Sequence, residues 1–449
     1  MKLDDLVPSN AAASRQDRAL RIAVVGGGIA GLGAAWLLGR QHRVTLFEAG
    51  AYAGGHANTV DVTVDGIRHP VDTGFLVFNR RTYPELCGLF AALDVPVAAS
   101  DMSFGVSLGA EDIEWAGTSV ATLFAQGANL ARPAFWQMLR DIRRFNAETT
   151  RLAREHAAPD VPLGVYLDRN GYSESFRNGY LLPMAAAIWS CPTEQMLHYP
   201  LNTFLRFCHN HGLLQILDRP QWLTVRGGSR EYVKRMLAGI SDLRLNWPVR
   251  RVIRDAGGVT VVCDAGSEQF DAIVFACHSD TTLAILGEEA TAAERAVLGA
   301  VRYQPNRAVL HTDPALLPRR RKVWSAWNYM AGEGRADQRP VSVSYLLNQL
   351  QPLPFHSPVM VTLNPFKEPS AGHVLAEFDY DHPVFDQGAI DAQAHLPALQ
   401  GRHRSWFAGA WTGYGFHEDG LRSAVNVAAM FGVAAPWRAR QLMLDEVHA

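Results

Sequence analysis

The stretch RIAVVGGGIAG, residues 21–31, decides the fold of this chain. Residues 21–25 form a short apolar run of the kind found in buried parallel strands. The glycines at 26, 28 and 31 have the spacing G-x-G-x-x-G, and residues 32–38 continue as a helix of small residues. A second apolar run, residues 44–47, ends at Glu48. This order of elements predicts a βαβ unit that binds a dinucleotide.

Each glycine of the G-x-G-x-x-G pattern, and the acid after the second strand, has a physical role in such a site. Gly26 permits a tight turn, Gly28 lets the backbone approach a pyrophosphate, and Gly31 lets the helix pack closely on the strand. The start of the helix offers N–H groups and a positive dipole to the phosphates. Glu48, seventeen residues after Gly31, is placed to accept the ribose hydroxyls, and its charge disfavours a cofactor with a 2′-phosphate.

Composition limits the class of protein. The chain has 449 residues, 48% of them hydrophobic, so it can bury a large core, and a net charge of −2 argues against a nucleic-acid binder. Five Cys without a CxxC pair favour a reduced, cytoplasmic chain. No apolar run approaches the roughly 18 residues of a spanning helix, and the first twenty residues have no apolar core of a signal peptide.

The rest of the chain alternates between helical and strand-like patterns. Residues 84–212 are largely helical in pattern, most clearly after Pro133, whereas 249–252, 259–263, 273–276 and 405–408 are strand-like and a further helix follows from about Leu421. We expect an α/β fold with a discontinuous Rossmann-like domain, formed by residues 18–80, 222–300 and 400–445 around a parallel sheet. Residues 81–221 and 301–399 would form an inserted, mixed α+β substrate domain.

Further motifs follow the βαβ unit. They are GGH at 54–56, VDTG at 71–74, RGGS at 226–229, FAGAW at 407–411 and EDG at 418–420. With them the chain, from about residue 21 to 435, resembles the flavin-containing amine oxidase and phytoene desaturase superfamily. Residues 189–192, 209–212 and 413–420 carry a closer resemblance to bacterial FAD-dependent proteins related to the N-terminal region of plant cyclopropane fatty acid synthases.

The resemblance implies FAD as cofactor and assigns residues to it. In that superfamily the glycine pair after the acid contacts the cofactor, and a strand near Val249 lines the adenine. The C-terminal glycine segment passes the pyrophosphate, and its helix points at the flavin pyrimidine, where a helix N-terminus stabilises the negative charge of reduced flavin. The expected cofactor-binding residues are Gly26, Gly28, Ile29, Ala30, Gly31, Glu48, Ala49, Gly54, Gly55, His56, Gly74, Phe75, Val249, Gly409, Ala410, Gly420, Leu421 and Ala424.

Two positions depart from the pattern of the amine oxidases. His56 stands where those enzymes usually have Arg, and Ala410 stands where they commonly have Glu. They also often place a Lys beside flavin N5, whereas this chain offers only Lys234 and Lys322 for that role.

The resemblance therefore favours an FAD-dependent oxidoreductase that takes hydride from a carbon of a hydrophobic substrate, best an unsaturated fatty acyl chain or lipid. Carbon–carbon dehydrogenation also needs a proton acceptor. The candidates are His417, Glu418, Tyr414 and His56, which flank segments expected near the flavin. The alternatives are an amine oxidase, a double-bond isomerase and a non-catalytic flavoprotein partner of a lipid-modifying enzyme.

No metal site is expected. Cys208, His209 and His211 lack a second ligand pair at zinc spacing, and the acidic group with Asp381 and His382 has the pattern of a solvated loop. The basic run at 319–322 is interpreted as a solvated loop, too short for nucleic acid. A sharper hypothesis pairs it with the basic helix after Pro133 as a peripheral contact for anionic membrane lipids.

Overall fold

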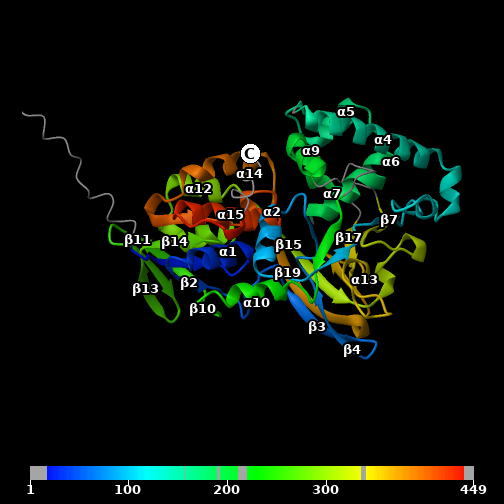
Figure 1. The fold of residues 1–449 in the computed structure, drawn as a ribbon. Coiled ribbons are helices and arrows are strands. Elements are labelled where there is room, and N and C mark those ends of the chain that lie inside the picture. Colours follow the sequence, from blue (N-terminus) through cyan, green and yellow to red (C-terminus); the bar gives the residue numbers. More distant parts are fainter. Residues whose placement is uncertain (1–17, 156, 190–192, 211–219, 335–339, 439–449) are drawn as a thin grey trace, which may run out of the picture.

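The computed structural model describes residues 18–155, 157–189, 193–210, 220–334 and 340–438. Two lobes lie side by side (Figure 1). The first holds β1, β2, β14, α1 and α15, and the second holds the cap of helices α4 to α9 above a larger sheet. Among the described residues, no helix combines the length and apolar character needed to cross a bilayer.

The first lobe is built on a five-stranded parallel sheet in the order β10-β2-β1-β14-β20. Along β1 the side chains alternate: Ile22 and Val24 enter one hydrophobic core, and Ala23 and Val25 enter another. Both faces are therefore covered, which explains why the strand is a continuous apolar run. The strands are β1 (Arg21–Val25), β2 (Arg43–Phe47), β10 (Asp242–Arg244), β14 (Ala272–Phe275) and β20 (Ser405–Phe407).

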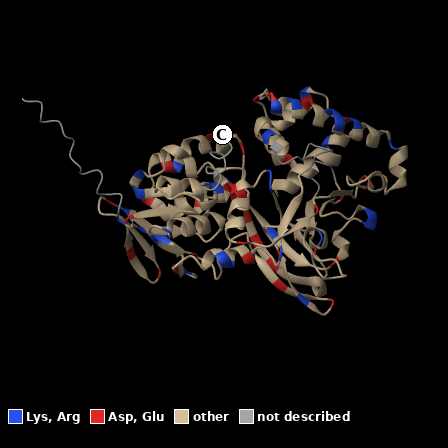
Figure 2. Cartoon of the chain, in the orientation of Figure 1, with Lys and Arg blue, Asp and Glu red and all other residues tan. Residues whose placement is uncertain are grey.

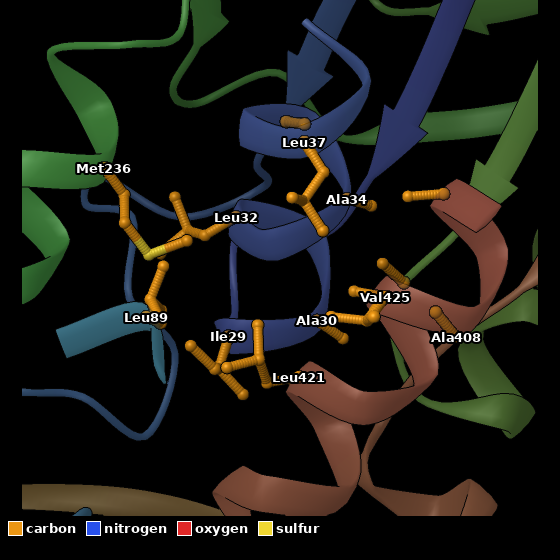
Figure 3. Packing of buried hydrophobic residues seen from close by; sticks show 14 of the residues in the cluster. Ile29, Ala30, Leu32, Ala34, Leu37, Leu89, Met236, Ala408, Leu421 and Val425 are labelled. Atoms are coloured by element: carbon orange, nitrogen blue, oxygen red, sulfur yellow. The ribbon is translucent and has the colours of Figure 1, made fainter. Parts of the chain in front are cut away.

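One face of this sheet is covered by α1 (Ile29–Leu38), α10 (Arg230–Leu237) and α15 (His417–Met430). Figure 3 shows Ile29 and Ala30 of α1 facing Leu421 and Val425 of α15. A Cβ at Gly33 would lie 2.9 Å from Leu421 Cδ1 and 3.1 Å from Ala424 Cβ, so glycine at this position lets the two helices approach closely. The prediction that the last helix starts near Leu421 is wrong by a turn, because Asp419 accepts from the Phe416 N–H (3.1 Å) and caps it earlier.

The opposite face is covered by a three-stranded antiparallel sheet and four helices. These are β11 (Val249–Arg254), β12 (Val259–Cys263) and β13 (Gly266–Phe270), with α11 (Ser279–Leu286), α12 (Ala292–Leu298), α14 (Gln387–His395) and the short helix η8 (Leu396–Ala398). The β11–β12 turn is held by Asp255, whose carboxylate accepts from the N–H groups of Gly257 and Gly258.

The second lobe is built on a seven-stranded mixed sheet in the order β19-β15-β18-β17-β16-β7-β8. All its neighbours are antiparallel except β16 and β7, which are parallel. The strands are β7 (Phe104–Leu108), β8 (Ile113–Ala116), β15 (Arg302–His311), β16 (Trp327–Ala331), β17 (Val341–Leu346), β18 (Met360–Leu363) and β19 (Val374–Val384).

A helical cap with its own aromatic core covers this sheet. It contains α4 (Pro133–Arg154), α5 (Leu163–Arg169), α6 (Glu174–Phe176), α7 (Leu182–Trp189), α8 (Thr193–Leu197) and α9 (Leu201–Asn210). Basic residues gather along α4, at the upper right of Figure 2. The expectation that 84–212 is largely helical is only partly right, because β6 (Val97–Ser100), β7 and β8 also fall there. β6 and β7 pair with strands outside this segment, and β8 pairs with β7.

Two small sheets join the lobes. The hairpin of β3 (Thr59–Val64) and β4 (Ile67–Asp72) places Val62, Val64 and Val71 in the core of the second lobe. The other is β5 (Phe78–Asn79), β9 (Trp222–Val225) and β6, beside α2 (Pro84–Ala92). The parallel strands come from the three segments predicted to form the nucleotide domain. The hairpin at 59–72 contacts both lobes, because Thr59 also accepts from the Arg230 N–H of α10 in the first lobe.

Candidate active site

A cavity of about 680 Å³ opens at the carboxyl edge of the parallel sheet and extends between the lobes. In open α/β sheets this edge is where ligands bind. Most of the predicted cofactor-binding residues line it: Gly26, Gly28, Ile29, Ala30, Glu48, Ala49, Gly54, Gly55, His56, Gly74, Phe75, Val249, Gly409 and Ala410. The fold therefore brings segments from residue 26 to residue 410 onto one wall.

The glycine loop at the start of α1 leaves room for a ligand. Gly26 has φ of +104°, and a Cβ there would lie 2.9 Å from the Ala276 carbonyl oxygen. At Gly28, the residue before α1, a Cβ would meet nothing within 4 Å. No side chain caps this helix, so its first N–H groups stay free to bind an anion at the cavity wall.

Glu48 is fixed by the backbone. Its Oε2 accepts from the Gly27 N–H (2.7 Å) and its Oε1 accepts from the Gly50 N–H (2.6 Å). Each carboxylate oxygen retains a further lone pair. Glu48 can therefore accept hydroxyl protons while its position is held by two backbone bonds.

Four of the predicted cofactor residues do not reach the cavity wall: Gly31, Gly420, Leu421 and Ala424. A Cβ at Gly31 would lie 1.7 Å from the Gly26 carbonyl oxygen, so this glycine serves the turn. Leu421 and Ala424 are buried against α1, and a Cβ at Gly420 would lie 2.9 Å from the Ile29 side chain. In the structure the last three pack α15 against α1, and their contact with a cofactor stays a prediction.

Three of the four catalytic candidates line the cavity, namely His56, Tyr414 and His417, but Glu418 does not. Glu418 is buried, and its carboxylate accepts from the N–H groups of Glu85 and Leu86, both at 3.0 Å. It therefore caps the N-terminus of α2, and burial raises its pKa. The structure thus gives this carboxylate a structural role at α2, away from the cavity wall.

His417 is held on two sides. Its ring stacks on Phe75 with centroids 3.9 Å apart, and its Nε2 lies 3.1 Å from the Tyr232 hydroxyl. Tyr232 is fully buried, and among the described residues its hydroxyl bonds to this Nε2. We therefore interpret the hydroxyl as the donor. The neutral ring of His417 then carries its proton on Nδ1. Burial lowers the pKa of His417 to about 3.

His382 is a cavity residue that the sequence analysis did not identify as part of the site. It lies on β19 and not in a solvated loop, because Phe378, Tyr380 and His382 alternate with acidic residues along the strand. Its Nδ1 lies 2.9 Å from Asn306 Nδ2, which also donates to the Gln304 carbonyl (3.0 Å). Nδ1 is thus an acceptor, and the neutral ring carries its proton on Nε2. Burial lowers its pKa to about 4.

His56 lies beside His382, with ring centroids 5.2 Å apart, and stacks on Tyr380 at 4.9 Å. Its Nε2 is buried and has no hydrogen-bond partner among the residues that the structure describes. Burial, and then the neighbouring histidines, lower its pKa well below the usual value, so the ring is neutral. A buried nitrogen without a partner on a cavity wall is available to bond to a ligand.

The end of the cavity away from the glycine loop is lined by apolar and aromatic side chains of the second lobe. They include Met102, Ile188, Trp189, Phe207, Trp327, Tyr345, Leu363, Phe385 and Phe416. Asp381 is the charged side chain that β19 adds, whereas Glu48 and Arg250 belong to the nucleotide end with Val249. This part of the site fits an apolar molecule.

Within the described part of the chain, no three His, Cys, Asp or Glu side chains are placed to hold a metal ion. The basic run is partly neutralised, since Arg320 pairs with the buried Glu114 (2.7 Å) and Arg319 with Asp112. Residues 190–192 and 211–212, which carry part of the closer resemblance, and His211 of the Cys–His group lie outside the described residues.

Comparisons with known proteins agree with this arrangement. Residues 29–309 match the family described as flavin containing amine oxidoreductase. A Mycobacterium tuberculosis protein with the provisional name flavin-containing monoamine oxidase AofH is 28% identical over 267 residues, 57% of this chain and 56% of that protein. This chain therefore matches little more than half the length of that relative.

Solved structures share the fold at low identity. A fatty acid isomerase from P. acnes that produces CLA superposes with a TM-score of 0.64 at 15% identity, covering 92% of this chain and 98% of that one. Cyclohexylamine oxidase from Brevibacterium oxydans gives 0.65 at 16% identity, covering 92% and 99%. The α/β fold with a Rossmann-like sheet and a mixed-sheet substrate domain is thus confirmed.

FAD is the cofactor implied by the family match, and the cavity fits it. The space beside Gly28 and the uncapped start of α1 suit a pyrophosphate, and Glu48 suits a ribose. Val249 and its neighbours Trp247 and Pro248 offer an apolar wall for a base. These residues would hold the nucleotide half, and the cavity then continues toward His56, His417 and the apolar end.

Proposed function

This chain belongs to the flavin-containing amine oxidoreductase family, and from that premise we propose that it dehydrogenates a hydrophobic substrate, an unsaturated fatty acyl chain or lipid, with FAD. The observation that carries the proposal is the apolar end of the cavity, where rings and aliphatic side chains converge and Asp381 is the charged group nearby. Binding an acyl chain there buries apolar area, at roughly 25 cal/mol per Å².

Bound FAD supplies the two-electron oxidation, by accepting hydride from a substrate carbon. The chain's own residues have to bind the acyl segment, exclude water and remove a proton from the adjacent carbon, so that a C=C bond forms. Phe385, Trp327 and Tyr345 would exclude water. Position and dryness are the two contributions that a protein makes to such chemistry.

We propose that His56 is the base that accepts the proton from the substrate carbon. The alternatives on the wall are less suited, because His417 Nε2 already accepts from Tyr232 and His382 Nδ1 already accepts from Asn306. Burial raises the pKa of Tyr414, which keeps the phenol protonated and a poor base. The lowered pKa of His56 keeps its ring neutral, and its Nε2 has no hydrogen-bond partner among the described residues, so no existing bond there competes for the proton.

Amine oxidation is the second candidate, and Asp381 is the observation that favours it, since a carboxylate on an aromatic-lined wall attracts a cation. The M. tuberculosis relative and cyclohexylamine oxidase carry names of that activity. Against it, no lysine lines the described cavity wall, and Lys234 and Lys322 lie on α10 and η6 (Arg321–Val323). The P. acnes structure lends support to an acyl substrate, and equally to a redox-neutral double-bond isomerase.

The test is an anaerobic spectrum of the flavin-loaded protein during addition of unsaturated acyl lipids, and separately of a panel of amines. We expect acyl lipids to bleach the flavin and amines to leave it oxidised. His56→Gln should slow the bleaching by about 10²–10⁴-fold, the range of general-base catalysis. His395→Gln, at an exposed position on α14, is the matched control. Bleaching by amines alone would contradict acyl dehydrogenation and favour amine oxidation.

A further inference from the structure

A second cavity, of about 240 Å³, lies against the apolar end of the main one. The two share the wall residues Trp189, Pro383 and Phe385. On its other side the second cavity is lined by the exposed residues His198 and Arg302, so it lies between the main cavity and the protein surface. We call it the head-group pocket.

Two buried polar atoms on the lining residues of this pocket have no hydrogen-bond partner among the described residues. They are the indole Nε1 of Trp189 and the amide Oε1 of Gln195. Trp189 is only 7% exposed, so water does not readily replace a missing partner. Leaving such an atom unpaired is unfavourable, so each one calls for an explanation, and a bound ligand or water is one.

The charges of the pocket cancel. Arg302 pairs with Asp386 at 2.7 Å, and the other oxygen of Asp386 accepts from the Ala389 N–H at the start of α14. A free carboxylate entering the pocket would meet an arginine whose charge is already compensated and an aspartate that repels it. An uncharged group would meet no such penalty: its carbonyl oxygen can accept from the indole N–H, and the N–H of an amide can also donate to Gln195 Oε1.

We propose that the head-group pocket binds the uncharged carbonyl end of an acyl ester or amide, while the acyl chain passes Trp189 and Phe385 into the main cavity. Trp189 Nε1 donates to the carbonyl oxygen of either group, and Gln195 Oε1 accepts from the N–H of an amide, a donor that an ester lacks. The inference rests on the proposed function for the choice of an acyl chain. It adds that the substrate is esterified or amidated and not a free fatty acid.

The pocket is tested by binding, independently of turnover. Calorimetric titration of the flavin-loaded protein with methyl decanoate, decanamide and decanoate at neutral pH should show the ester and the amide binding at least tenfold more tightly than the acid. Trp189→Phe removes the indole N–H and keeps a ring. It should weaken the ester and the amide by about two- to thirteenfold, the net contribution of one hydrogen bond, and leave the acid unchanged.

Trp136→Phe, at an exposed tryptophan on α4, is the matched control and should change nothing. Gln195→Leu is a second variant that should weaken the binding of the amide and leave the ester unchanged, without altering flavin content. Equal binding of acid and ester, or equal weakening of both by Trp189→Phe, would overturn the proposal that this pocket binds an uncharged carbonyl group. Ester that binds as expected but never reduces flavin would uphold the pocket and reject the proposed dehydrogenation, so the two failures are distinguishable.

Discussion

The Gly28→Ala variant tests whether glycine is needed at this position for protein stability or for binding of FAD. Gly28 has φ of −72° and ψ of −177°, a conformation open to any residue, and an added Cβ meets no protein atom within 4 Å. The protein alone should therefore tolerate alanine, at a cost of at most about 1 kcal/mol for a poorer helix N-cap. The methyl group instead occupies the space in which the pyrophosphate is expected.

The magnitude follows from the contacts at stake. Losing the close approach of the phosphate to the backbone costs one charge-assisted hydrogen bond, about 1.5–3 kcal/mol, which raises the FAD dissociation constant by about 10- to 150-fold. The assay is fluorescence titration of the apoprotein with FAD, with a parallel thermal melt of the apoprotein. Gly127→Ala, whose Cβ also meets nothing within 4 Å, is the control. Unchanged FAD affinity in Gly28→Ala would refute the placement of the cofactor.

Three further predictions concern buried polar groups. Glu418→Gln should lower the free energy of unfolding by about 1–2 kcal/mol in urea, because α2 loses a charged cap, while flavin reduction by substrate stays normal; a selective loss of reduction would restore Glu418 as a catalytic group. Asp72→Asn should cost about 1–3 kcal/mol in the same assay, because the Ser229 N–H and hydroxyl both donate to that carboxylate; no change would show the network to be dispensable. The pKa of His417 falls from 6.5 unfolded to about 3 folded, so the unfolded state binds the proton first as pH falls. Stability from this residue is present above about pH 6.5 and is lost toward pH 3 at up to about 1.4 kcal/mol per pH unit. His417→Gln should flatten that slope in urea titrations between pH 4 and 7, and an identical slope in both proteins would contradict the assignment.

The nucleotide half of the site could be predicted because its signals are local. The strand, the glycine turn, the helix and Glu48 lie within residues 21–48, and the glycine spacing follows from backbone geometry. The parallel strands were also predicted near their observed positions, because their signal is a short apolar run. The start of α15 was predicted four residues too late, because it depends on one capping carboxylate, that of Asp419.

The substrate half depends on contacts between distant segments. Glu418 became a structural cap because the fold brings α2, more than three hundred residues earlier, against its carboxylate. Trp189, Trp327 and Phe385 meet in one wall from α7, β16 and the end of β19, and no local pattern links them. His382 was within reach of the sequence, because the alternation of residues 377–382 is that of a strand with one aromatic face.

The most direct measurement of the central claim is the mass of the acyl product after a single anaerobic turnover. Flavin-loaded protein is mixed with an unsaturated acyl ester, the reduced flavin is quantified by its absorbance, and the lipid is analysed by mass spectrometry. Dehydrogenation predicts a product that has lost two hydrogens, in equal amount to the flavin reduced. An acyl product of unchanged mass with its double bond displaced, or an untouched lipid beside flavin that only amines reduce, would contradict the account.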